Sequence, residues 1–195
     1  MSKMKTRDHI VDAADRLFYQ QGFERTSFSD IADVVNISRG NFYYHFKTKD
    51  EILDAVIQLR LANTRRMLEE WEEAGEAPEA RVRCFIHVLI RNQAKIKLYG
   101  CPVGTLNTEL AKLNHESQVD ARAIFTLFRD WLETQFRMMG RDRDADQLAM
   151  ELLARSQGAA TLYTAFRDDA FVEREVRQMC DWLQAIAVGT GASLH

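Results

Sequence analysis

Proline is scarce in this chain of 195 residues, where it occurs only at Pro78 and Pro102. Because proline interrupts helices more strongly than any other residue, its scarcity favours long helices. The hydrophobic fraction of 46% and the charged fraction of 28% are those of a globular protein. The length suffices for one sizeable core, or for a small domain beside a larger one. We therefore expect an all-α fold.

Cysteine is also scarce, and long hydrophobic runs are missing. Cys84, Cys101 and Cys180 are odd in number and have no paired spacing, which fits a reducing cytosol better than a disulfide framework. The longest apolar run, residues 84–90, is interrupted by His87 and is far too short to cross a bilayer. No secretion signal is visible. The sequence thus predicts a cytoplasmic protein with no membrane partner.

An excess of basic charge is lacking as well. The net charge is −3 at pH 7, and acidic and basic residues balance over the first part of the chain, up to Arg60. The net charge argues against a non-specific polyanion binder of the histone-like kind. If the protein binds a nucleic acid, the placement of its charges must matter more than their sum.

Residues 26–49 carry the strongest motif, which begins with a short helix and a tight turn. Ser27 is placed to cap that helix, with Asp30 three residues later as its capping-box partner. Asn36 stands where the chain must reverse, and asparagine tolerates the left-handed conformation of such turns. The apolar face of the helix is expected to consist of Ile31, Ala32, Val34 and Val35.

A second short helix follows the turn. Ser38 is its predicted N-cap, and Phe42 and Phe46 recur four residues apart as its buried stripe. A helix that presents hydrogen-bonding and aromatic groups suits the major groove of DNA, so the pattern predicts a helix-turn-helix. The alternative is that Tyr43 and Tyr44 pack against neighbouring helices. The outward residues are expected to be Arg39, Asn41, Tyr43, Tyr44 and His45.

Residues 6–53 resemble the TetR family of bacterial transcriptional regulators. The likeness rests on Thr-Ser at 26–27, Asp-Ile-Ala at 30–32 and the run from Ile37 to Leu53. The chain departs from the family pattern at Asn36, where glycine is usual, and at Asn41, where threonine is commoner. Asparagine is the next best residue for a positive φ angle, so the first departure leaves the expected fold unchanged.

The resemblance implies DNA contacts for particular side chains. Arginine can bond guanine, and asparagine adenine, through paired hydrogen bonds that are worth roughly 1 to 3 kcal/mol of discrimination each. The motif places Arg39, Gly40, Asn41 and Tyr43 at base edges, and Ser27, Tyr44, His45 and Lys49 at phosphates, with Ser38 also in the interface. Basic charge is expected in two groups, Lys3, Lys5 and Arg7 before the first helix and Arg39, Lys47 and Lys49 around the recognition helix.

About nine helices are expected in all. We predict a helix-turn-helix DNA-binding domain over residues 1–47 and a helical ligand-binding and dimerisation domain over residues 48–195. Thr48 is a predicted N-cap with Glu51 as its capping-box partner. Beyond the loop at 72–78, helices are predicted at about residues 78–99, 105–113, 116–139, 144–166 and 171–188.

The last two helices carry the pattern of a packing seam. Apolar residues recur at four, three, four and three in the last helix, and small residues gather in the one before it. The resemblance implies a homodimer through these two helices, and the alternative is packing within the chain's own core. The residues concerned are Val172, Val176, Met179, Leu183 and Ile186, with Ser156, Gly158, Ala159 and Ala160.

Cys101 is a candidate thiol sensor, because it precedes a predicted helix start, where partial positive charge favours the thiolate. The alternative is a small residue that shapes a turn. Cys84 and His87 lie three apart on one helix, but two ligands do not make a metal site, so core packing is preferred. Catalysis with Cys101 as the nucleophile would need His87 or His115 as its base, and no motif connects them.

We therefore expect a regulator with no catalytic site, no cofactor and no metal. It binds double-stranded operator DNA as a homodimer, most simply as a repressor that a small-molecule effector of unknown identity releases. An alternative is an electrophile-sensing repressor that acts through Cys101. An architectural DNA binder is disfavoured, since it would not need so large a second domain.

Overall fold

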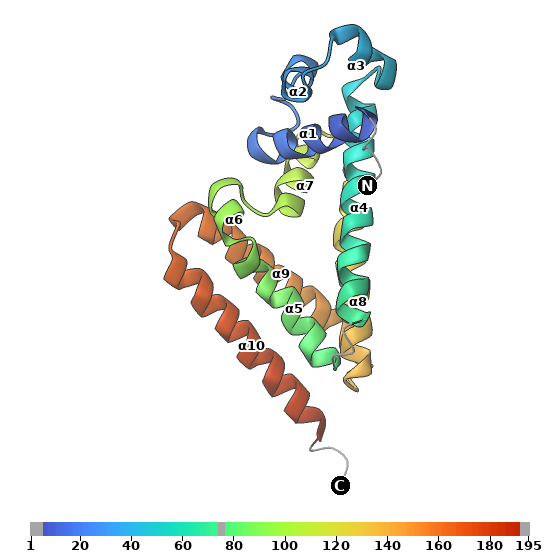
Figure 1. The fold of residues 1–195 in the computed structure, drawn as a ribbon. Coiled ribbons are helices and arrows are strands. Elements are labelled where there is room, and N and C mark those ends of the chain that lie inside the picture. The colour runs from blue at the N-terminus through green and yellow to red at the C-terminus, as the bar shows by residue number, and fades with distance from the viewer. Residues whose placement is uncertain (1–5, 74–76, 192–195) are drawn as a thin grey trace. The chain divides into compact units, whose positions relative to one another are not determined.

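The computed structural model describes residues 6–73 and 77–191, and within these ranges it is built from α-helices alone (Figure 1). The all-α prediction is confirmed. None of the described helices is both long enough and apolar enough to cross a membrane. The helices are α1 Thr6–Gln21, α2 Phe28–Val35, α3 Arg39–His45, α4 Lys49–Glu73, α5 Pro78–Arg91, α6 Gln93–Tyr99, α7 Pro102–Lys112, α8 Gln118–Met138, α9 Ala145–Phe166 and α10 Asp169–Gly191.

One predicted helix is divided in two. Residues 78–99 form α5 and α6, with Asn92 as both the end of the first and the start of the second. The Asn92 side-chain amide donates to the carbonyl of Val88 at 3.1 Å. Asparagine side chains that bond the backbone compete with helix continuation, which is the local reason for the break. α7 begins at Pro102, earlier than predicted, because proline fits the first position of a helix.

The chain divides into two compact units, and α4 and α8 each contribute to both. Unit 1 consists of the residues up to Asn63 together with Pro102–Ile124, and unit 2 consists of Thr64–Cys101 and the residues from Phe125 onward. The functional division at residues 47 and 48 stays a prediction, since these units are defined by packing alone.

Unit 1 combines the first three helices with the start of α4, α7 and the start of α8. Its core is apolar and includes the predicted stripe of the second short helix, with Phe42 and Phe46 each only 1% exposed. An ion pair joins α4 to α1 between Arg60 Nε and Asp15 Oδ1 at 2.6 Å, and the same guanidinium donates to the carbonyl of Pro102 at 2.7 Å. Other fully buried members are Ile10, Ala14, Ile31, Ile52, Leu53, Val56, Ile57 and Leu110.

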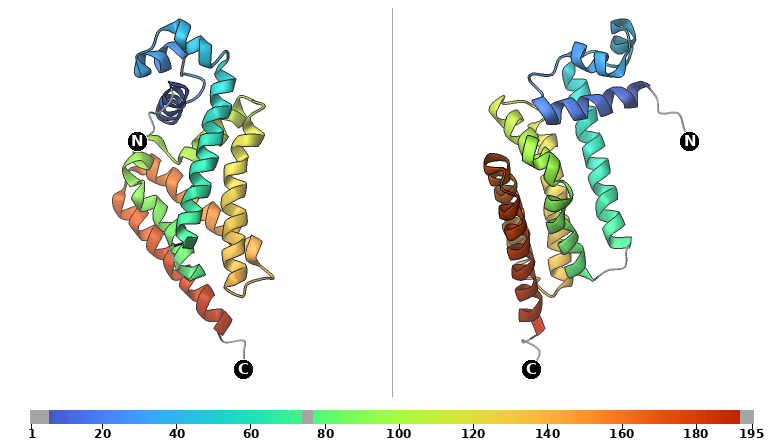
Figure 2. Two further views of the ribbon diagram at one scale, coloured as in Figure 1. Left: turned by 45° about the vertical axis from the view of Figure 1, so that its right-hand side comes forward. Right: turned by 60° about the vertical axis from the view of Figure 1, so that its left-hand side comes forward.

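In unit 2, α10 packs along α5 and α9, while α6 packs on α9 (Figures 1 and 2). The predicted seam of α10 lies in this core: Val172 and Leu183 are fully buried, and Met179 is 3% exposed. Ser156, Ala159 and Ala160 of α9 are buried as well. Assigning the α10 seam to a subunit interface was therefore wrong, because α5 and α9 of the same chain already cover it. The same holds for Ala159 and Ala160, which belong to the same core. Of the four small residues assigned to the seam, Gly158 alone faces outward.

A polar cluster fixes the start of α10. The Asp169 carboxylate accepts hydrogen bonds from the Tyr163 hydroxyl at 2.5 Å and from Lys97 at 2.9 Å. The Tyr163 hydrogen bond first, and then the Lys97 ammonium, hold the pKa of Asp169 below its usual range. Thr164 donates to the carbonyl of Ile96 at 2.8 Å. These contacts tie α6 to the connection between α9 and α10.

Candidate DNA-binding site

α2 has both halves of the predicted capping box. The amide of Asp30 donates to Ser27 Oγ at 3.2 Å, and the amide of Ser27 donates to Asp30 Oδ2 at 2.7 Å. Hydrogen bonds from Ser27, first of all its backbone amide, hold the pKa of Asp30 below its usual range. A cap of this kind contributes about 1 kcal/mol to helix stability, so the start of α2 is set by its own sequence.

The turn after α2 also follows its residues. Asn36 adopts the left-handed conformation at φ 56, and its amide donates to Asp33 O while that of Ile37 donates to Ala32 O, both at 3.2 Å. One expectation fails here: Val34 was assigned to the apolar face but is 51% exposed. Successive helical residues are about 100° apart, so the Val34 side chain lies outside the arc between Ile31 and Ala32, which forms the buried face.

α3 presents the predicted residues outward around one buried anchor. Ser38 Oγ accepts the amide of Asn41 at 3.3 Å, which confirms its role as N-cap. Phe42 is buried and packs on Phe28 with ring centroids 5.2 Å apart. His45 is half-buried and is the last residue of the helix. The exposed residues are Arg39, Gly40, Asn41, Tyr43 and Tyr44.

The two tyrosines differ in what they contact. Tyr44 is 79% exposed, and its ring meets His45 edge to face at 5.1 Å. Tyr43 is 46% exposed and stands edge to face on Phe28 at 5.5 Å. Tyr43 therefore leans on α2 with one side of its ring and leaves the other side outward, so the two tyrosines are not both packed away against neighbouring helices.

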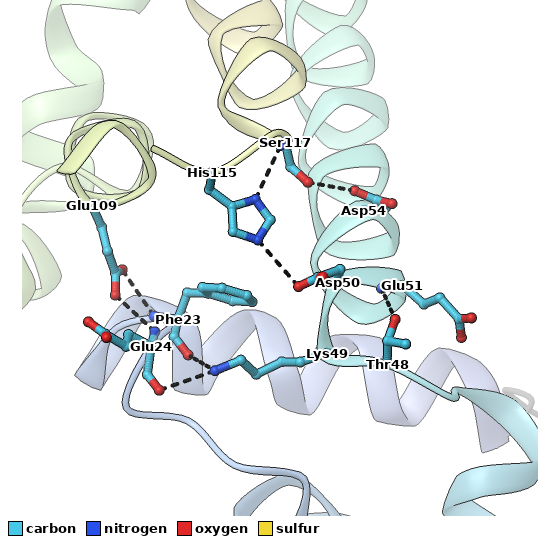
Figure 3. Close-up of polar contacts among 10 residues, drawn as sticks. All are labelled: Phe23, Glu24, Thr48, Lys49, Asp50, Glu51, Asp54, Glu109, His115 and Ser117. Carbon is cyan, nitrogen blue, oxygen red and sulfur yellow. Dashed lines mark hydrogen bonds and ion pairs between the residues drawn. The ribbon is translucent and has the colours of Figure 1, made fainter. Parts of the chain in front are cut away.

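Lys49 makes contacts that the sequence did not suggest. Its ammonium donates to the carbonyls of Phe23 and Glu24, each at 3.1 Å, and lies 4.3 Å from the centre of the Phe23 ring (Figure 3). Nearby, Thr48 caps α4 as predicted by accepting the amide of Glu51 at 3.1 Å. In a capping box the Glu51 carboxylate would accept the amide of Thr48. It accepts the amide of Lys47 instead, at 2.7 Å.

Two surface hollows lie among the first four helices. A cleft of about 460 Å³ opens between the α1–α2 turn and the start of α4, and a smaller groove of about 160 Å³ lies between α2 and α3. The cleft adds Arg25, Ser29 and Thr48 to the predicted site residues, and sequence reasoning missed them because single polar residues in a turn carry no periodic signal. Its lining is Glu24, Arg25, Thr26, Ser27, Phe28, Ser29, Thr48 and Lys49.

The basic residues are only partly placed as expected. Arg7 belongs to the first turn of α1 and not to an arm before it, and its guanidinium stacks 4.7 Å from the centre of the Phe46 ring. Lys3 and Lys5 lie outside the described residues. Lys47 is exposed and donates to the carbonyl of Tyr43. Arg39 is exposed and donates to Ser29 Oγ at 3.4 Å.

In the described part of the chain, the cysteines and histidines outside this region do not assemble into a site. Cys84, Cys101 and Cys180 are all half-buried. His87 is exposed and bonds the carbonyl of Arg83 at 2.8 Å, so its predicted core packing was wrong. Among residues 6–73 and 77–191, no three His, Cys, Asp or Glu side chains gather in a way that could hold a metal ion.

Family models match nearly the whole chain. Residues 10–56 match the model for bacterial regulatory proteins of the tetR family, and residues 61–178 match that for the C-terminal domain of LmrA/YxaF-like transcriptional regulators. The chain belongs to the TetR family. This confirms the resemblance seen at residues 6–53 and extends it beyond the helix-turn-helix. TetR-family proteins are transcription regulators, so the expectation of a non-enzyme is confirmed as well.

Individual TetR-family proteins show how far the similarity extends. The chain is 31% identical over 123 residues to an uncharacterised helix-turn-helix regulator from the lacX 3′ region of Lactococcus lactis, covering 62% of this chain and 63% of that protein. It is 25% identical over 169 residues to the transcriptional repressor DhaR of Mycobacterium sp. strain GP1, covering 82% of each.

Solved structures support the fold. A TetR regulator from Legionella pneumophila superposes with a TM-score of 0.80 at 22% identity, covering 93% of this chain and 98% of that one. A TetR-family regulator from Agrobacterium tumefaciens gives a TM-score of 0.80 at 24% identity, covering 90% of this chain and 96% of that one. The fold of the described residues is thus that of solved TetR-family structures.

Proposed function

We propose that this protein is a cytoplasmic repressor that binds a specific operator in double-stranded DNA through α3 and leaves it when a small molecule binds unit 2. The observation that carries the proposal is the outward face of α3. Arg39, Asn41 and Tyr43 point away from a helix that the buried Phe42 anchors. Membership of a family of transcription regulators supports the same function.

The bases would be read from the N-terminal half of α3. Arg39 and Asn41 offer paired hydrogen bonds to guanine and adenine. Gly40 supports a close approach of DNA, because beyond its chain neighbours and the nearby backbone of its own helix no heavy atom lies within 4 Å of the place where its Cβ would be. The chain therefore has no packing need for glycine at this position, whereas a DNA backbone passing close to the helix would.

The phosphates would be held around the rim of that helix. The hydroxyls of Ser27 and Ser38 accept hydrogen bonds in the two caps, and each still has its own hydrogen to donate. Tyr44, exposed at the end of α3, adds a phenol donor. Lys49 supports a phosphate site more as a positive charge in the cleft than as a free donor, since two carbonyls already accept its hydrogens.

The operator itself supplies the first test. Wild-type protein is used to select bound duplexes from a random library. The affinity for the most enriched duplex is then compared with the affinity for a duplex of random sequence. We expect Tyr43→Ala to lose about 1 to 3 kcal/mol of discrimination between the two. Tyr43→Phe, which keeps the ring contact with Phe28, separates the hydroxyl from the packing. Unchanged discrimination in Tyr43→Ala would remove Tyr43 from base reading, and failure of the wild type to select any sequence would overturn the proposed function.

We further propose that a second copy of the chain covers the exposed face of α9. Over residues 150–166 this face carries small or apolar residues and one threonine, with Met150 47% and Leu162 45% exposed, and the ion pair between Glu151 and Arg155 lies within the same arc. A helix face turned to water is normally polar, so such a stripe marks an interface. Gly158 at its centre leaves room for close helix packing. The stripe consists of Met150, Ala154, Gly158, Thr161, Leu162, Ala165 and Phe166.

Recognition of a specific DNA site requires a second copy of the chain. α3 has seven residues and reaches only a few base pairs, so a single copy holds too few contacts for a specific site. Two-fold dimers place two such helices one helical turn apart, about 34 Å or a multiple of it. A stripe that is continuous along α9 is self-complementary about a two-fold axis. Dimerisation through the last two helices therefore remains our proposal, on a face other than the buried seam.

A thiol-sensing repressor is the alternative, and Cys101 is its candidate. Cys101 directly precedes Pro102, the first residue of α7. Burial raises the pKa of Cys180, and the nearby Arg83 offsets this only in part. All three cysteines are half-buried, so we expect any difference in reactivity to come from these surroundings.

Limited alkylation at pH 7 checks this alternative. We expect Cys101 to be labelled before Cys180, whose labelling should become efficient only at higher pH than for an ordinary thiol, since only the thiolate reacts. Peptide mass analysis is paired with binding to the selected operator, and Cys101→Ser is the control. Earlier labelling of Cys84 or Cys180, or full labelling of Cys101 with unchanged operator affinity, would leave Cys101 as a structural residue.

A further inference from the structure

The turn between α1 and α2 is held on both sides of the same two residues (Figure 3). The Glu109 carboxylate of α7 accepts the amide of Phe23 on Oε2 and that of Glu24 on Oε1, each at 3.0 Å. From α4, Lys49 Nζ donates to the carbonyls of Phe23 and Glu24 at 3.1 Å. An acid and a base from two helices distant in sequence thus grip one short piece of backbone.

Gly22 is the residue that lets Glu109 come this close. Its φ of +95 lies in the region that favours glycine, and a Cβ at this position would stand 2.8 Å from Glu109 Oε1. The carboxylate therefore occupies the space where any other side chain would begin. The sequence of the turn and the position of Glu109 are matched to each other.

The segment after α7 adds three more contacts within unit 1. The His115 ring stands edge to face on Phe23 at 5.2 Å, and its Nε2 lies 3.3 Å from Asp50 Oδ1 at the start of α4. Ser117 donates to Asp54 Oδ1 at 3.0 Å (Figure 3). α7 and the residues that follow it are thus fixed both to the turn and to α4 within unit 1.

The turn held by Glu109 and Lys49 runs directly into the cleft of about 460 Å³. Glu24 and the five residues after it form one wall, while Thr48 and Lys49 form the other. Any shift of the turn along α7 would change the separation of the two walls. We propose that Glu109 is a positioning residue for DNA binding, which sets the phosphate-facing wall of this cleft without touching DNA itself. The inference rests on the proposed function.

Because Glu109 is negatively charged, the direction in which DNA affinity changes on its neutralisation distinguishes a positioning role from simple repulsion. An acidic group near a phosphate site repels DNA, so neutralising an acid without a positioning role should strengthen binding. Neutralising a positioning residue should weaken it. In Glu109→Gln the amide keeps one acceptor oxygen but turns an NH₂ donor toward the second backbone amide. One of the two hydrogen bonds to the turn is then lost, while the size of the side chain is retained.

The experiment measures binding to the duplex selected by wild-type protein over a range of salt concentrations. For Glu109→Gln we expect affinity to fall about tenfold and the salt slope to shrink by about one phosphate contact. A smaller folded fraction would lower apparent affinity without changing that slope. The matched control is Glu116→Gln, which removes the same charge from an exposed residue of the same unit and should bind as well as wild type or better.

Glu109→Asp keeps the charge but is one methylene too short to span both amides, so it should show the same loss with a smaller effect on folding. Both variants are compared well below their melting temperatures. Wild-type or higher affinity in Glu109→Gln, or weaker binding with an unchanged salt slope in both variants, would overturn the positioning role. A wild-type protein that selects no duplex would instead reject the proposed function.

Discussion

Leu162→Glu is expected to give a folded monomer that no longer holds the operator. The change places a charge in the middle of the exposed α9 stripe, where a second copy would have to bury it. Because linking two binding modules raises affinity by about 10²- to 10⁴-fold, operator affinity should fall by a factor in that range. Folding should change little, because Leu162 is 45% exposed and is not part of the core of unit 2.

Light scattering at micromolar concentration, a thermal melt and operator titration measure the three parts of this expectation. Met138→Glu is the matched control, because Met138 is an apolar residue of unit 2, 58% exposed, that lies on α8 away from the stripe. It should remain dimeric and bind the operator. A Leu162→Glu protein that stays dimeric would place the subunit interface elsewhere.

Met179→Glu, by contrast, is expected to unfold unit 2. Met179 is 3% exposed within the core shared by α5, α9 and α10, so the variant must bury an unpaired carboxylate there. The cost should be about 4 kcal/mol or more, a large part of the stability of a domain. The change should therefore yield insoluble or unfolded protein and no folded monomer.

Denaturant titration followed by circular dichroism measures the loss. Met179→Leu, which nearly conserves volume, should cost less than about 1.5 kcal/mol and serves as the control. A soluble, folded monomer from Met179→Glu would contradict the intramolecular packing of α10 and return its stripe to the subunit interface. Comparison with Leu162→Glu then separates the buried face of these two helices from the exposed one.

The local features of the DNA-binding region could be predicted because their causes lie within a few residues. Ser27 and Asp30 satisfy each other's backbone across three positions, and Asn36 takes a conformation that its own side chain permits. Phe42 and Phe46 share a face because four residues make about one helical turn. Val34 was misassigned because the window is short and an apolar residue next to an apolar face resembles a member of it.

The pattern of α10 shows where local reasoning ends. The recurrence of Val172, Val176 and Met179 correctly indicated a buried face, yet a period says only that a face is covered and not by what. Packing against α5 and α9 determines what covers this face. α5 is far from α10 in sequence, and the way in which α9 meets α10 depends on the fold. The stripe on α9 was missed in turn, because small residues and a threonine give a weak hydrophobic signal.

The sequence by itself determined the all-helical class, the caps and turn of the helix-turn-helix, the outward face of α3 and, through the motif at residues 26–49, the family. These follow from propensities and hydrogen bonds between near neighbours. Only the tertiary structure decided that α10 is covered by its own chain, that Lys49 holds carbonyls of the α1–α2 turn, and that Glu109 grips the amides of that turn from 86 positions away in sequence. Contacts of this range depend on how helices pack, and no short stretch of sequence encodes that.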